Sequence, residues 1–192
     1  MSYDITHKDG LFQVGADDVS FGAPSVSTVT AKHVQFGPFI QSTITLTDVA
    51  QTVVNGTEYQ GTKIFDFPAG RLNVLGVTAT LQQTTTSALA TTLNASSTGA
   101  IGLGTATASA TTLATTMVDL LPSTAFTSSA TINVAGTAVS NALAAAAQFD
   151  GTTTAKDMYL NTAYATTTDV DGDATQTISG TIVVTWIQLG DY

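Results

Sequence analysis

Residues 62–81, which read TKIFDFPAGRLNVLGVTATL, decide the fold. From Thr62 to Phe67 the side chains alternate, so that Phe65 and Phe67 fall on one face, as in a half-buried strand. Pro68-Ala69-Gly70 then predicts a turn, because proline removes an amide donor and glycine permits unusual dihedral angles. A second extended segment follows directly. The stretch therefore predicts a strand-turn-strand unit.

The second of these strands, Arg71 to Leu81, changes the face of its apolar side chains part of the way along. The apolar positions run Leu72 and Val74, and then, on the other parity, Leu75, Val77, Ala79 and Leu81. Gly76 lies at the change. One inserted residue moves a set of side chains from one face to the other, so we predict a β-bulge near Gly76.

Two more strands and one helix are predicted outside this unit. Ser42 to Thr47 places Ile44 and Leu46 on one face and threonines on the other, which is the period of a strand. Thr177 to Leu189 puts Ile178, Ile182, Val184 and Trp186 on one face and partly apolar side chains on the other, as in a central strand or one that packs on a partner. Val139 to Phe149, which contains four consecutive alanines, is the best candidate for a short helix.

The composition favours β-structure throughout the chain. Thr makes up about a fifth of the residues, and its branched side chain prefers extended backbone. Aromatic residues account for only 7% and Cys is absent, so the core must consist of aliphatic side chains and a few Phe. We predict an all-β fold with one short helix, an irregular N-terminal arm over residues 1–40 that packs on the core or on a neighbour, and a single sandwich domain over residues 41–192.

The charge of the chain excludes two classes of partner. Lys and Arg number 5 against 14 acidic residues, and the net charge of −9 would repel a phosphate backbone, so we expect no direct binding of nucleic acid. No apolar run approaches the length that spans a bilayer, and anionic lipid surfaces need more cationic side chains, so we expect no membrane association. The first ten residues lack the apolar region of a secretory signal, which indicates synthesis in the cytoplasm.

Few residues point to chemistry. His7 and His33 lack the spacing of a metal or catalytic pair, no nucleophile motif is present, and we expect neither an enzyme nor a bound cofactor. Gly99, Gly102 and Gly104 have the wrong order for a phosphate loop and more plausibly relieve crowding in a sheet. Asp169, Asp171 and Asp173 alternate in a short acidic turn that is a weak candidate for a Ca²⁺ site, and an ordinary acidic turn between strands is the favoured explanation.

Four blocks of the sequence resemble a known family, the small jelly-roll capsid cement or decoration proteins of tailed bacteriophages. The blocks are Phe65 to Arg71 with the following Leu72 to Ala79, Gly102 to Ala106, Val118 to Thr124, and Gly180 to Tyr192. They are scaffold motifs and carry no binding residue. The resemblance implies a jelly-roll β-sandwich that binds the outer surface of the phage head and stabilises contacts between subunits of the major capsid protein.

The resemblance also implies a homotrimer located in the virion after synthesis in the host cytoplasm. Two alternatives remain open at this point. One is a tail, baseplate or head-fibre component, which is also a virion structural protein. The other is a secreted β-sandwich adhesin or carbohydrate-binding module, for which an exposed aromatic platform would be expected. Trp186 lies in a predicted core strand, which argues against such a platform.

Overall fold

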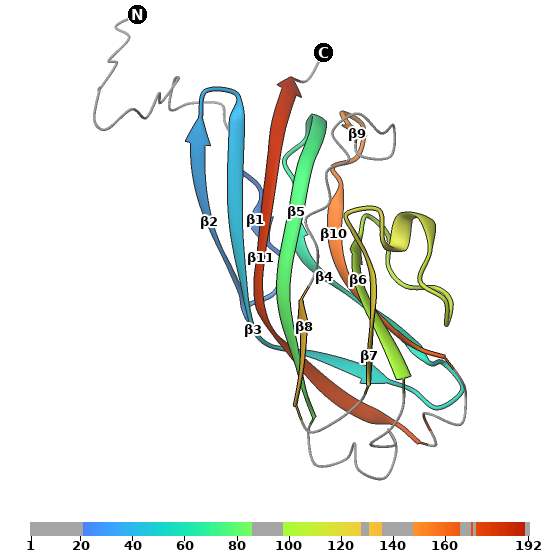
Figure 1. Cartoon of the computed structure of the whole chain (residues 1–192). Coiled ribbons are helices and arrows are strands. Elements are labelled where there is room, and N and C mark those ends of the chain that lie inside the picture. The colour runs from blue at the N-terminus through green and yellow to red at the C-terminus, as the bar shows by residue number, and fades with distance from the viewer. Residues whose placement is uncertain are drawn as a thin grey trace, which may run out of the picture.

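The chain forms two antiparallel β-sheets packed face to face (Figure 1). The computed structural model describes residues 21–85, 98–127, 131–135, 148–165, 170 and 172–190. Sheet A has the order β1 (Ala23–Pro24), β4 (Tyr59–Asp66), β10 (Asp157–Tyr164), β6 (Thr98–Gly104) and β7 (Leu121–Thr127). Sheet B has the order β2 (Val29–Phe36), β3 (Phe39–Val53), β11 (Ala174–Gly190), β5 (Gly70–Thr85) and β8 (Thr131–Ala135), and β9 (Gln148–Gly151) also pairs with β5. A 3-10 turn, η1 (Thr115–Met117), lies between β6 and β7.

The connections between the sheets are those of a jelly roll. If β3 to β8, β10 and β11 are counted as strands 1 to 8 of the roll, sheet B runs 1-8-3-6 and sheet A runs 2-7-4-5. This arrangement places two Greek keys back to back in a double-sheet sandwich. The prediction of an all-β, jelly-roll-like sandwich is therefore confirmed.

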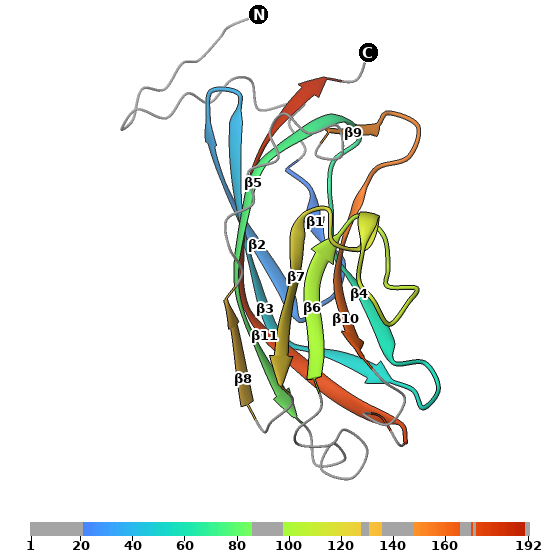
Figure 2. The ribbon, with the colours of Figure 1, turned by 45° about the vertical axis from the view of Figure 1, so that its right-hand side comes forward.

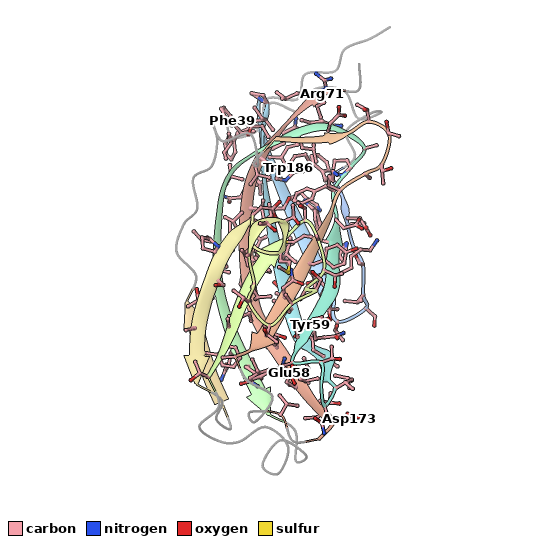
Figure 3. The ribbon with its side chains drawn as sticks, turned by 90° about the vertical axis from the view of Figure 1, so that its right-hand side faces the viewer. Phe39, Glu58, Tyr59, Arg71, Asp173 and Trp186 are labelled. Carbon is pink, nitrogen blue, oxygen red and sulfur yellow. The ribbon has the colours of Figure 1, made fainter. Side chains whose placement is uncertain are left out.

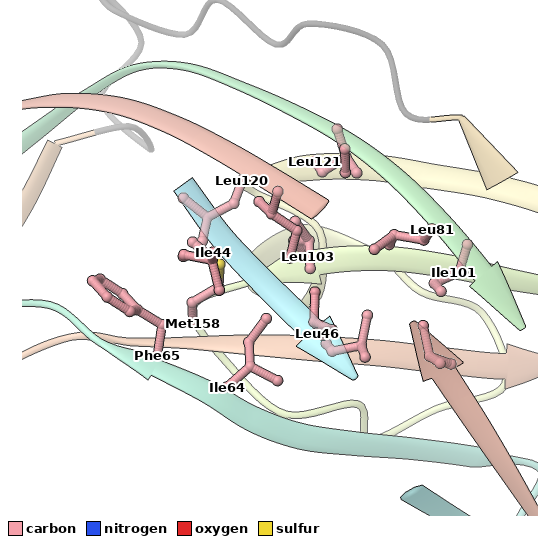
Figure 4. Close-up of a cluster of buried hydrophobic side chains, with 14 of the residues drawn as sticks. Ile44, Leu46, Ile64, Phe65, Leu81, Ile101, Leu103, Leu120, Leu121 and Met158 are labelled. Atoms are coloured by element: carbon pink, nitrogen blue, oxygen red, sulfur yellow. The ribbon is translucent and has the colours of Figure 1, made fainter. Parts of the chain in front are cut away.

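The core lies between the sheets and follows the predicted alternation. In β3, Ile44 and Leu46 are buried while Thr45 and Thr47 are exposed. Figure 4 shows Ile44 and Leu46 in the same cluster as Ile64 of β4. An aromatic group fills one end of the sandwich, where the ring of Phe67 meets Phe65 at 5.2 Å and Trp186 at 6.0 Å, both edge to face.

The predicted bulge in β5 is present. Thr185 of β11 pairs with Gly76 and the next residue, Trp186, pairs with Val74, so Leu75 is the extra residue. Val74 and Val77 on either side of the bulge are both buried, which is the change of parity expected from the sequence. The bulge lets one long strand keep an apolar inner face along its whole length.

The last strand is central, which is one of the two positions predicted for it. β11 lies between β3 and β5, and its buried side chains include Ile178, Ile182, Val184 and Trp186. Both of its neighbours are also long strands, so the middle of sheet B consists of three strands that run most of the length of the sandwich (Figure 1).

The structure corrects part of the predicted N-terminal arm and the end of the predicted helix. Residues 29–40 do not belong to an irregular arm, because β2 pairs with β3 through a tight hairpin from Val29 opposite Leu46 to Phe36 opposite Phe39. Residues 1–20 of the predicted arm lie outside the described residues. The helix predicted from Val139 to Phe149 also lies mostly outside them, but its last two residues, 148 and 149, belong to strand β9.

Candidate functional site

The outer face of sheet A is covered in part by the chain itself. The loop of residues 105–120, which carries η1, lies on the side of sheet A away from sheet B (Figure 2). Asn161 of β10 is fully buried beneath it, where its Nδ2 donates to the carbonyl oxygens of Ala106 (2.8 Å) and Met117 (2.7 Å) and its Oδ1 accepts from the N–H of Ala108 (2.8 Å). A small cluster of apolar side chains, separate from the main core, packs there as well: Ala108, Leu113, Met117 and Ala163.

Glycines allow this loop and its neighbours to approach the sheet. A side chain at Gly104 would meet the backbone of Met117, one at Gly102 would meet Val118, and one at Gly99 would meet the ring of Phe126. The prediction that these glycines relieve crowding in a sheet is confirmed.

The outer face of sheet B carries an exposed apolar patch at the end that holds the β2–β3 turn. We call it the hairpin patch and define it as Val34, Phe36, Phe39, Ile187 and Leu189. Phe36 is 56% exposed and Phe39 49% exposed, and the register places Phe36, Phe39 and Ile187 side by side across three strands. Large side chains gathered on one face in this way are typical of a surface that binds another macromolecule.

Arg71 lies at the same end of the molecule as Phe39 (Figure 3). Its guanidinium is 3.8 Å from the carboxylate of Asp150, and both side chains are well exposed. A pair of this kind contributes little to stability, but it leaves a charged rim beside the apolar patch.

The interior of the sandwich contains a polar network that joins the two sheets. Its members are Gln51, Gln83, Thr162, Tyr164 and Gln176, all of them buried. Gln176 is at the centre: its Oε1 accepts from the hydroxyl of Tyr164 (2.7 Å) and from Nε2 of Gln83 (2.9 Å), and its Nε2 donates to Oγ1 of Thr162 (2.9 Å). Because these groups bond to one another, the network serves the core rather than a ligand.

Trp186 does not form a platform for sugar binding. Its side chain is fully buried, and its Nε1 donates to Oγ of Ser42 at 3.0 Å. The same hydroxyl lies 2.9 Å from Nδ1 of His33, whose ring stacks on Phe21. Burial lowers the pKa of His33. His33 is thus a packed side chain of β2, while His7 lies outside the described residues.

The structure brings together two carboxylates that are distant in sequence. Asp66 of β4 and Asp157 of β10 are direct cross-strand partners. Nζ of Lys63 lies 2.6 Å from Asp66 and 3.5 Å from Asp157. Burial, and after it the hydrogen bond to Asp66, raise the pKa of Asp157. Burial also acts to raise the pKa of Asp66, but hydrogen bonds from Lys63, Asp157 and Ser25 outweigh it, so the pKa of Asp66 is lowered. All three charged side chains are partly exposed and neutralise one another in part, so the cluster is an ordinary surface ion-pair group.

The predicted calcium turn is only partly described. Asp169 and Asp171 lie outside the described residues, and Asp173 is exposed at the start of β11, where it accepts the N–H of Asn55 at 3.0 Å. Among the described residues, no group of three or more His, Asp or Glu side chains could hold a metal ion. The bond to Asn55 is what an acidic turn between strands would make.

Within the described part of the chain, no helix is long and apolar enough to cross a membrane. The chain matches no family model, no curated protein and no solved structure. The hairpin patch is the feature that sequence reasoning missed. Its signal was the pair Phe36 and Phe39 around Gly37-Pro38, a two-residue turn between apolar positions.

Proposed function

We propose that this chain is a non-enzymatic structural protein of a phage particle, a cement protein that binds the outer surface of the head and stabilises contacts between subunits of the major capsid protein. The observation that carries the proposal is the hairpin patch, an exposed apolar surface on a jelly-roll sandwich. The blocks that resemble phage cement proteins support it. They fall at the β4–β5 corner, in the loop over sheet A and in β11, which are positions that build the scaffold.

The low charge of the chain suits a role in a repeated shell. Charged residues make up 10%, against roughly 25% in ordinary globular proteins. Such a surface can pack closely with little desolvation of ions, and many copies of a modest interface add up over a shell through avidity. The homotrimer that the resemblance implies stays a prediction.

The number of copies per particle tests the proposal. Quantitative mass spectrometry of purified particles that contain the chain should give hundreds of copies, in a fixed ratio to the major capsid protein. Six or twelve copies per particle would contradict the cement role and favour the alternative, a tail, baseplate or head-fibre component.

A variant pair tests the docking surface. Phe39→Asp combined with Leu189→Asp should abolish rebinding of the purified protein to stripped particles, because both side chains lie in the hairpin patch and are about half exposed. Thr45→Asp combined with Thr78→Asp is the matched control, since both threonines are exposed on sheet B outside the patch. Equal rebinding by the two variants would exclude the patch as the capsid contact.

A further inference from the structure

Strand β2 forms an edge of sheet B with which no strand of the described part of the chain pairs. It is eight residues long, pairs with β3, and stands at the end of the strand order. Its register with β3 runs from Val29 to Phe36 without a shift, so no bulge turns it aside. Soluble proteins usually blunt such an edge with charges, proline, a bulge or a very short strand.

The side chains of this edge are as unusual as its backbone. The outward positions are Thr30, Lys32, Val34 and Phe36, of which Val34 is 42% exposed and Phe36 56% exposed. Lys32 is the one formal charge in the strand, which contains no proline, since Pro24 precedes it and Pro38 follows it in the turn. An exposed, regular strand with apolar side chains is a template for pairing with another strand.

Charge favours a second copy of this chain as the partner strand. With a net charge of −9, two copies repel one another over most of their surfaces. Residues 19–47, which include all of β2 and its turn, contain no Asp or Glu. The β2 edge is therefore a place where two identical copies can meet without opposing carboxylates.

We infer that β2 pairs with β2 of a second copy, antiparallel and around a two-fold axis at Val34. An isologous contact of this kind satisfies both copies with the same surface. In this register Val34 lies opposite Val34 of the second copy, and Lys32 lies opposite Phe36 of the second copy. The two hairpin patches then join across the new sheet.

The choice of register follows from the side chains. An axis at Lys32 would place two ammonium groups directly opposite each other, which is destabilising. An axis at Val34 instead puts each Lys32 beside an aromatic ring, a favourable cation–π arrangement, and brings two apolar side chains together. The pairing also uses the backbone groups that β2 directs away from β3, because an antiparallel ladder bonds to each neighbour through alternate residues.

This contact does not depend on the proposed virion role, since it follows from the edge and charge of the isolated chain. A single pair of strands is a small interface, so the dimer should be weak and concentration-dependent. Light scattering or sedimentation equilibrium of the full chain over about 1–200 μM, the range suited to such interfaces, should show the mass rising from 19.6 kDa toward twice that value.

Opposite charges at Val34 test the axis. Val34→Lys alone and Val34→Glu alone should each stay monomeric, because like charges would face each other at the axis. An equimolar mixture of the two should recover the dimer, since each Lys would then meet a Glu. Thr78→Lys, at an exposed position of β5, is the matched control and should dimerise as the unmodified chain does.

Cross-linking tests the register, because the chain contains no cysteine and gives a clean background. Val34→Cys should form a disulfide-linked dimer on mild oxidation, and Thr78→Cys should not. The inference would be overturned by a chain that stays monomeric throughout the concentration range, or by a trimer whose mass Val34→Lys leaves unchanged. A dimer in which Val34→Cys cross-links no faster than Thr78→Cys would overturn the register.

Discussion

Replacing Asn161 by alanine should release the loop of residues 105–120 from sheet A. The side chain is fully buried and makes three hydrogen bonds to the backbone of that loop, to Ala106, Ala108 and Met117. A net contribution of about 1 kcal/mol for each bond gives a loss of about 3 kcal/mol in the free energy of unfolding. For a chain of this size that corresponds to a fall of roughly 6–12 °C in Tm.

Two measurements separate a detached loop from general weakening. Differential scanning calorimetry gives the change in Tm, with Thr78→Ala on the exposed face of sheet B as a control that should change it little. Limited digestion with chymotrypsin well below Tm should cut Asn161→Ala near Leu113 and Met117, which are buried in the intact protein. A Tm lowered by less than about 2 °C, together with a loop that still resists digestion, would refute the assignment of Asn161 as its anchor.

Three further perturbations test the interior. Burial lowers the pKa of His33 in the folded protein, so the unfolded chain binds the proton more readily as the pH falls below about 6.5. Acidification should therefore lower the stability of the fold. His33→Gln removes this titration and should reduce the fall in Tm between about pH 7 and pH 5. Gln176→Leu removes the central member of the buried network and with it the bonds to Tyr164, Gln83 and Thr162, which should lower the free energy of unfolding in urea by about 2–4 kcal/mol. An unchanged midpoint would show that the network is dispensable. Gly104→Ala would place a side chain against the backbone of Met117 and should lower the free energy of unfolding by about 2 kcal/mol or more. A Tm equal to that of the unmodified chain would contradict this close approach of the loop.

The β-bulge in β5 and the central position of β11 could be predicted because each has a local signal. At Gly76 the apolar side chains change parity within one strand, and the sheet register shows the extra residue next to it, at Leu75. In β11 the inward face is apolar and the outward face is partly so, through Val183 and Ile187, which is a pattern found in central strands. Where the inward residues are hydrophobic and the outward ones polar, sequence alone is a good guide.

Strand β2 was missed because its polarity is inverted. Its inner positions include His33 and Gln35, whereas Val34 and Phe36 face outward. A reading that assigns apolar side chains to the core cannot find a strand whose apolar side chains are exposed. The same inversion that hid the strand produced the hairpin patch, so the missed element and the candidate site are one feature.

The buried glutamines and the carboxylate pair were out of reach for a different reason. Gln51 and Gln176 are separated by 125 residues, and Asp66 and Asp157 by 91, so only the register of the sheets brings each pair together. The side chains themselves carry no signal of burial, because glutamine and aspartate are mostly exposed in other proteins.

The central place of β11 has a consequence for how the protein is made. β3 and β5 flank β11 and do not pair with each other, so during synthesis both leave the ribosome with the edges that will receive it unfilled. Sheet B cannot be completed until residues 174–190 have been translated and have paired with both β3 and β5. Contacts between residues this distant in sequence form slowly. A nascent chain stalled before residue 174 would hold two long strands, β3 and β5, each with the edge that receives β11 left unpaired. Sheet B of this jelly roll therefore cannot be completed before residues 174–190 have been translated, so the unfilled edges of β3 and β5 are open to wrong pairing until then.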